Sequence, residues 1–222
     1  MDEFVSMIRQ PIGRRGALRM AIVAAGLSAA GWQANAQSAN AAGPTAPIQQ
    51  LNAALLSAMQ AGQHSAFAQR YAELEPVIDR TFDLNAVLAA SVGLRWPGLP
   101  DDQKTQLLAA FRRYTVSSYA ANFDNYTGQR FDISPGVRNV GNGSVIVETQ
   151  LVPAHGSATR LDYVMRNGAS GWRAVDVLAD GSISRVAVQR SDFRYLLMNG
   201  GVPALVAGLQ TKVASLSGGM QA

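Results

Sequence analysis

The chain has 222 residues, 48% of them hydrophobic, and a formal net charge of +4, so it can bury a sizeable core. It has no cysteine and only two histidines, which excludes a disulfide framework, a cysteine nucleophile, a zinc finger and a multi-histidine metal site. A charge this small and unclustered argues against nucleic acid as a partner and against membrane binding by charge alone.

Residues 1–36 contain the three parts of a secretory signal. The pair Arg14-Arg15 precedes an uncharged apolar stretch that starts at Met20, and Ala34-Asn35-Ala36 suits a cleavage site. The stretch is shorter than the roughly 20 residues of a membrane-spanning helix, so we favour a cleaved signal over an uncleaved anchor. The order Arg-Arg-x-x-Leu-Arg resembles a twin-arginine signal, but Ala17 departs from that pattern and leaves Sec export open. The sequence predicts a soluble exported protein.

The next segment, residues 37–46, is rich in Ala, Ser, Asn, Gly and Pro, and is predicted to be a disordered leader. A first helix is predicted over residues 47–62, because apolar side chains recur every three or four positions there. A second stripe of this kind spans residues 67–78, and Pro76 is expected to bend or break it. Two amphipathic helices should therefore begin the folded domain.

A short third helix is predicted over residues 84–92, with Asp83 as its N-terminal cap and Gly93 at its end. Residues 96–100 contain two prolines and a glycine, and they predict a loop.

The longest helix is predicted to follow Asp101, which is expected to cap it. Its apolar side chains keep a 3.6-residue period over about 25 residues. This stripe either faces the core only or also walls an apolar cavity, and the sequence leaves both possibilities open. The stripe consists of Leu107, Leu108, Phe111, Tyr114, Tyr119, Phe123 and Tyr126.

After Gly128 the period of the pattern changes from 3.6 to 2, which indicates β-strands. Short glycine-containing segments between them, at residues 141–143, 167–168 and 180–181, predict tight turns and hence an antiparallel meander. The strands are expected at residues 130–133, 145–149, 161–165, 172–177 and 183–188.

A short helix capped by Ser191 is predicted to follow, then a break at Gly200-Gly201, a final amphipathic helix over residues 202–216, and a tail at 218–222. Helices, strands and helices in that order predict a single α+β domain over residues 47–217. Helices from both ends of the chain would cover a curled antiparallel sheet of about five strands and enclose an apolar cavity.

The sequence has no phosphate-binding loop, HExxH, GxSxG or EF-hand motif. Asp176 and Asp180 are candidates for a general acid–base pair, although we favour a turn as the role of Asp180. Asp162 alternates with apolar neighbours and is expected to face solvent, while His64 and His155 are expected to be exposed. We therefore predict a protein that is not an enzyme, with no catalytic residue, cofactor or metal.

Several segments resemble the periplasmic phospholipid-binding MlaC family, also called the toluene-tolerance auxiliary family. The pattern Gly-x-Trp-Lys-Val-x-Asp-Val, followed by an acidic-Gly-Val-Ser-Leu turn, is similar to residues 171–177 and 180–184 here. Weaker likenesses lie in residues 190–193, 200–205 and 111–119, so the resemblance spans roughly residues 47–215. Ala174, Arg185 and Arg190 depart from the family pattern.

This resemblance implies a monomeric periplasmic carrier that moves phospholipid between an outer-membrane lipoprotein complex and an inner-membrane ABC transporter with an MCE ring. The acyl chains would lie between sheet and helices, with the headgroup near solvent. The Ala-rich, twin-arginine N-terminus is also similar to the HpnM branch associated with hopanoid biosynthesis, which makes a hopanoid-type lipid the alternative cargo.

Three hypotheses remain: a lipid carrier, which we favour; an enzyme that acts on an apolar substrate with Asp176 or Asp162 as base; and an interaction module with a solid core. For the carrier, Gly200-Gly201 is a candidate hinge. The residues expected to line its apolar cavity are Ile78, Phe82, Leu88, Phe111, Tyr114, Phe123, Val147, Tyr163, Trp172, Val175 and Val177.

Overall fold

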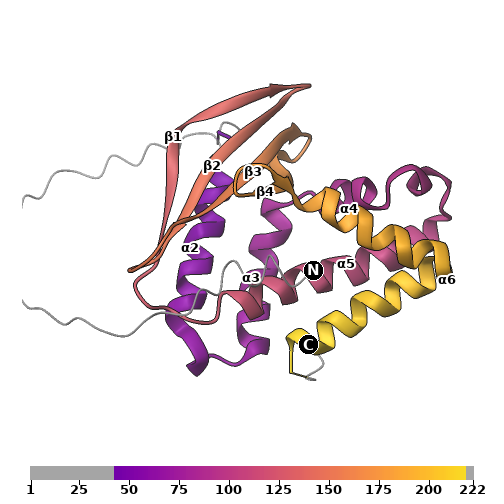
Figure 1. Ribbon diagram of the computed structural model, residues 1–222, viewed down its shortest axis with the longest axis horizontal. Helices are drawn as coiled ribbons and strands as arrows, with labels where there is room; N and C mark the ends of the chain where they lie inside the picture. The colour runs from indigo at the N-terminus through magenta and orange to yellow at the C-terminus, as the bar shows by residue number, and fades with distance from the viewer. Residues whose placement is uncertain (1–42, 219–222) are drawn as a thin grey trace, which may run out of the picture.

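The computed structural model describes residues 43–218, so the predicted signal, most of the predicted leader and most of the tail lie outside the described residues. Helices precede and follow an open five-stranded antiparallel sheet (Figure 1). The prediction of an α+β fold is therefore confirmed. Within residues 43–218, no helix is long and apolar enough to cross a bilayer.

The described part of the chain starts with two helices that pack on each other and on the sheet: α2 (Ala46–Ala61) and α3 (Phe67–Thr81), joined by the 3₁₀ turn η1 (Gly62–His64). The predicted stripe of α2 is confirmed, since its apolar residues are buried. Of the two effects expected of Pro76, a bend or a break, the break is wrong, because α3 continues to Thr81. Pro76 and Ala72, whose carbonyl loses its helical partner, are both exposed, so water can satisfy that carbonyl.

A buried arginine fixes α3 against the end of the long central helix. Arg70 is 6% exposed. Its guanidinium donates to the carbonyl oxygens of Ala120 at 3.0 Å, Gly62 at 3.3 Å and Ser65. Three carbonyls thus satisfy a cation whose burial would otherwise be costly.

The third helix, α4 (Leu84–Val92), is capped as predicted, because Asp83 Oδ1 accepts the Ala86 amide at 2.9 Å. Residues Gly93–Gly98, which include part of the expected loop, form a second 3₁₀ segment, η2.

The long central helix is α5 (Asp101–Asn122). The prediction that Asp101 caps it is wrong: Pro100 takes the cap position, and Asp101, as first helical residue, pairs with Lys104 at 3.2 Å. Its carboxylate still favours the positive end of the helix dipole. Tyr126 lies beyond the helix and is 41% exposed, so the apolar stripe is shorter than predicted.

The sheet is the predicted meander, with its strands in sequence order. Two of its hairpins turn through residues with positive φ, at Asn142 (50°) and Gly143 (70°), and at Asp180 (50°) and Gly181 (72°). Such paired positive angles match the right-handed twist of the flanking strands. The strands are β1 (Arg130–Gly141), β2 (Ser144–Val152), β3 (Thr159–Gly168), β4 (Gly171–Ala179) and β5 (Ile183–Ser184).

The fifth strand is much shorter than predicted. It ends at Ser184, and residues 185–188, expected as strand, begin the last helix, α6 (Arg185–Leu216). The Ser184 hydroxyl caps this helix by accepting the Ala187 amide at 3.0 Å. Ser191, the cap that we predicted, lies inside the helix instead.

A kink at Gly201 divides α6 into two halves. Gly201 has φ 64° and ψ −157°, a conformation open almost only to glycine, so the predicted break is confirmed. Figure 1 shows the second half, in yellow, folded back towards α5. At Gly208 a Cβ atom would lie 3.0 Å from Leu196 Cδ1, so this glycine lets the two halves approach closely.

Polar contacts hold the first half of α6 to α4 and η2. Arg190 Nε donates to the Ala90 carbonyl at 2.9 Å, and Arg95 Nη1 donates to the Leu197 carbonyl at 3.2 Å. A third contact joins the same elements: the buried Ser91 hydroxyl of α4 donates to Gln189 Oε1 of α6 at 3.0 Å. The first half of α6 and α4 therefore form one unit.

Candidate functional site

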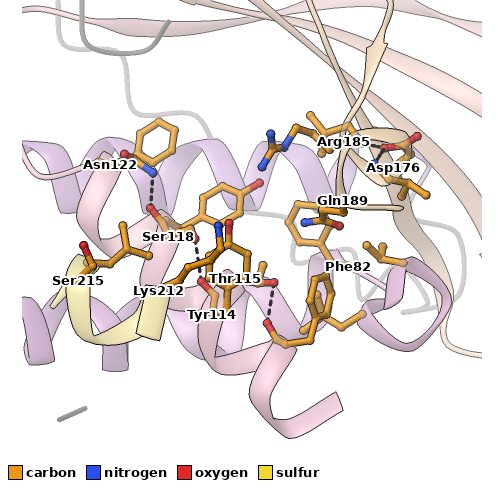
Figure 2. A pocket seen from close by; sticks show the side chains of 18 residues that line it. Phe82, Tyr114, Thr115, Ser118, Asn122, Asp176, Arg185, Gln189, Lys212 and Ser215 are labelled. Atoms are coloured by element: carbon orange, nitrogen blue, oxygen red, sulfur yellow. Dashed lines mark hydrogen bonds between the residues drawn. The ribbon is translucent and has the colours of Figure 1, made fainter. Parts of the chain in front are cut away.

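A cavity of about 210 Å³ lies where α4, α5, β4 and the two halves of α6 meet (Figure 2). Apolar side chains provide most of its surface, and charged or polar groups gather along α5 and α6. The lining residues are Phe82, Leu84, Val87, Phe111, Tyr114, Thr115, Ser118, Tyr119, Asn122, Phe123, Asp176, Val177, Arg185, Val186, Gln189, Lys212, Ser215 and Leu216.

Aromatic rings that contact one another form the walls of this cavity. Tyr119 stacks on Phe123 with ring centroids 5.8 Å apart, and Phe82 lies 5.8 Å from Tyr119 on the other side. Phe111 meets Phe193 of α6 edge to face at 6.2 Å. Paired rings resist collapse, because their preferred offset and edge-on geometries fix their positions. The α5 stripe thus serves the core, through Leu107, and also walls a cavity.

The structure brings five of the eleven predicted cavity residues to this lining: Phe82, Phe111, Tyr114, Phe123 and Val177. The other six lie elsewhere. Ile78, Leu88, Val147 and Tyr163 are at most 1% exposed within the core, while Trp172 and Val175 are half-buried away from the lining.

The main omission of the sequence reasoning was α6, which contributes six lining residues from Arg185 to Leu216. Interpreting residues 183–188 as a strand removed the start of this helix from consideration. A signal was available: Ser184 followed by apolar or buried positions at 186, 189, 193 and 197 has the spacing of a capped helix.

Three tyrosines remain neutral at ordinary pH: Tyr114 and Tyr119 line the cavity, and Tyr163 lies in the core. Burial raises the pKa of Tyr163, while a hydrogen bond with Tyr119 opposes that rise. Burial also raises the pKa of Tyr119, with a further contribution from Tyr163. The pKa of Tyr114 is raised chiefly by burial as well, and the nearby Arg185 guanidinium acts in the opposite direction. These hydroxyls therefore act as hydrogen-bonding groups without charge.

The carboxylate of Asp176 holds the start of α6. It accepts the Ser184 hydroxyl and the amides of Val177 at 2.8 Å and Val186 at 3.1 Å. Asp180, proposed as its acid–base partner, is exposed in a hairpin turn. Asp176 thus has a positioning role that its sequence context did not reveal.

Asp162 does not face solvent as predicted: it is 0% exposed. It lies beneath arginines on the sheet, with Arg160 Nη2 at 2.7 Å and Arg138 Nη2 at 3.9 Å from its Oδ2. The alternation did place it opposite the core, but long arginine side chains cover that face.

His64 and His155 are exposed, as expected. Among residues 43–218 there is no group of three or more His, Cys, Asp or Glu side chains that could hold a metal ion.

Two cations reach the cavity from opposite ends of α6. Arg185 is the first residue of this helix and Lys212 lies near its end, and Figure 2 shows both side chains extending into the pocket. Together with Asp176 they are the charged groups of the lining. The arrangement offers an apolar volume beside a positively charged region, which suits an amphiphile better than a purely apolar molecule.

A family model described as MlaC protein matches residues 49–211, which is most of the chain. The chain belongs to the MlaC family. The match takes in every strand of this MlaC protein and all cavity residues except Lys212, Ser215 and Leu216, which follow it directly.

A solved structure, the phospholipid-binding protein from Ralstonia solanacearum in complex with a phospholipid, is similar to this MlaC chain, with a TM-score of 0.69 and 19% identity. The likeness covers 79% of this chain and 99% of the other, and at that identity it shows a shared fold. No curated protein sequence matches this chain closely enough to count as a relative.

Proposed function

We propose that this protein is a periplasmic carrier that binds a phospholipid by its acyl chains. The observation that carries the proposal is the aromatic-walled cavity between α4, α5, β4 and α6. Membership of the MlaC family and the shared fold with a phospholipid-bound protein support it.

The energetics suit a carrier that must both retain and release its cargo. Burial of about 400 Å² of acyl-chain surface contributes roughly 10 kcal/mol before the costs of binding are subtracted. The cavity, at about 210 Å³, is smaller than the roughly 300–1,000 Å³ of typical ligand pockets, so two acyl chains require it to widen. Movement of residues 202–216 about Gly201 would widen it, because Lys212, Ser215 and Leu216 line the cavity.

The proposed route runs between the inner and outer membranes. An exported monomer that receives lipid from one membrane-bound complex and delivers it to another needs no catalytic group. An inner-membrane ABC transporter with an MCE ring and an outer-membrane lipoprotein complex are the proposed partners. Of the eleven cavity residues expected from the sequence, we propose as cargo contacts the five that line the cavity. A hopanoid-type lipid is the alternative cargo.

The proposal is tested by identifying the lipid that the protein carries. Protein purified gently from the periplasm of its native cells should show one bound lipid in native mass spectrometry, and extraction should identify it as a phospholipid or a hopanoid. Protein that is empty and takes up no lipid from vesicles would contradict the carrier function.

A cavity-filling variant links any bound lipid to this site. Ser118→Trp adds an indole to the cavity wall, and we expect it to reduce bound lipid at least tenfold, since overfilling a site is costly. Ala109→Trp adds the same ring to an exposed position of α5 and should retain the lipid. Equal lipid content in the two variants would place the lipid elsewhere.

A further inference from the structure

The kink in α6 brings together two cations that are far apart in the sequence. Arg185 and Lys212 are separated by 27 positions on α6. On a straight helix that separation corresponds to about 40 Å. Because the helix reverses at Gly201, both side chains line the same cavity instead (Figure 2).

Most of the other polar groups of the lining already serve the fold. Thr115 and Ser118 donate to carbonyls of their own helix at 2.9 and 2.8 Å, and Asn122 donates to the Ser118 carbonyl at 2.7 Å. Asp176 is occupied by the start of α6. Arg185 and Lys212 also interact within the protein, yet they leave the lining with two positive charges and one negative charge.

The surroundings strengthen the electrostatic effect of these cations. Apolar and aromatic groups form most of the wall, so charge interactions inside are less screened than in water. The positive charge of Arg185 affects its neighbour Tyr114, because it opposes the rise in the pKa of Tyr114 that burial causes. A ligand whose negative group lies near Arg185 and Lys212 would be stabilised by both cations.

We propose that Arg185 and Lys212 together hold the phosphate of a lipid with net negative charge, so that the cavity selects anionic phospholipids over zwitterionic ones. This inference rests on the proposed carrier function. An anionic lipid such as phosphatidylglycerol places its phosphate between two cations, and its acyl chains lie against the aromatic wall. A zwitterionic lipid brings a cation of its own, which the two side chains repel.

The test compares two short-chain lipids that differ in headgroup charge. Delipidated protein is titrated with dihexanoyl phosphatidylglycerol and with dihexanoyl phosphatidylcholine, below their micelle concentrations, by isothermal titration calorimetry. We expect the anionic lipid to bind about tenfold more tightly, which corresponds to about 1.4 kcal/mol. This preference should shrink as salt is added.

Variants assign the preference to the two cations. Arg185→Gln and Lys212→Gln should each weaken phosphatidylglycerol binding about tenfold and change phosphatidylcholine binding less than twofold, as expected for one charge-assisted hydrogen bond. Arg185→Lys keeps the charge and should retain the preference even if the packing around Arg185 changes. Arg194→Gln removes an exposed charge from the same helix and should behave as the wild type.

The remaining outcomes separate the inference from the proposed function. Equal binding of the two lipids, unaffected by the variants, would overturn the inference and leave the carrier standing. Inorganic phosphate that displaced phosphatidylglycerol at comparable concentration would show a site for free phosphate and would also overturn it. Failure of both lipids to bind would overturn the carrier function itself.

Discussion

The two ends of this molecule are built from similar apolar side chains, which are fully buried at one end and line a hollow at the other. Where α2 and α3 meet the sheet, aliphatic side chains such as Ile48, Leu51 and Ile78 are 0% exposed. Where α4, α5 and α6 meet β4, the side chains enclose a cavity of about 210 Å³. Burial of apolar residues therefore does not by itself determine whether a core closes.

The difference lies in the shape of the side chains and the continuity of the helices. Where α2 and α3 meet the sheet, most of the buried apolar side chains are flexible aliphatic chains, and the helices run without a kink. On the hollow side, rings in fixed mutual contacts hold α5 away from its neighbours, and α6 bends at Gly201. The cavity lies where rigid groups prevent the collapse that flexible groups permit.

The sharpest test of this comparison is the same truncation at both ends. Leu51→Ala should lower the free energy of unfolding by about 3 kcal/mol, because a fully buried leucine leaves a void that its neighbours cannot fill. Leu84→Ala removes the same atoms from the wall of an existing cavity and should cost about half as much. Urea denaturation measures both. Equal costs would show that the two ends are packed alike.

A second test removes the bend. Gly201→Ala places a side chain at φ 64° and should lower the free energy of unfolding by about 2 kcal/mol, with weaker lipid binding since Arg185 and Lys212 separate. Gly98→Ala, where an added Cβ meets nothing within 4 Å, is the matched control and should be close to neutral. A Gly201 variant with normal stability and normal lipid binding would refute the role assigned to the kink.

The smallest expected effect is the pH dependence of stability that comes from Tyr163. This residue lies at the boundary between the two ends, where the centroids of its ring and the Phe82 ring are 6.3 Å apart. Burial raises the pKa of Tyr163 above its ordinary value of 10.0. The folded protein therefore keeps a proton that the unfolded chain loses, so this contribution to stability is complete below pH 10 and is lost as pH rises above it. The expected loss is at most about 1.4 kcal/mol per pH unit.

Denaturation of Tyr163→Phe between about pH 9 and 11 checks this sign. The variant should lose stability with pH less steeply than the wild type, because it lacks one of the groups whose ionisation favours unfolding. Tyr126→Phe, at a position that is 41% exposed, is the control and should keep the wild-type slope. A steeper slope in Tyr163→Phe would contradict the assignment.

Sequence reasoning was most successful where the signals were local. The cap at Asp83, the turns with positive φ and the glycine break in α6 follow from backbone chemistry within a few residues, and the structure confirms them. The short links between the strands predicted the antiparallel meander, and the order of the strands in the sheet confirms it.

It was less successful where distant segments decide the outcome. The start of α6 depends on Asp176, which accepts the Val186 amide from another element, and the alternating pattern at residues 183–188 carried no sign of this contact. Asp162 is covered partly by Arg138 of β1, and the pattern of the strand that carries Asp162 does not show this contact from another strand. The cavity residues in the second half of α6, such as Lys212, were missed because they reach the cavity only through the fold-back at Gly201.

The hydrogen bonds of Arg190, Arg95 and Gln189 also set the direction in which this protein can open. They join the first half of α6 to α4 and η2, so an opening movement that preserved them would leave that half in place. The moving segment would be residues 202–216. It would rotate about Gly201, and opening would break the close contact of Gly208 with Leu196. Lys212 belongs to the moving segment and Arg185 to the fixed half, so one phosphate bound between them would hold the cavity closed.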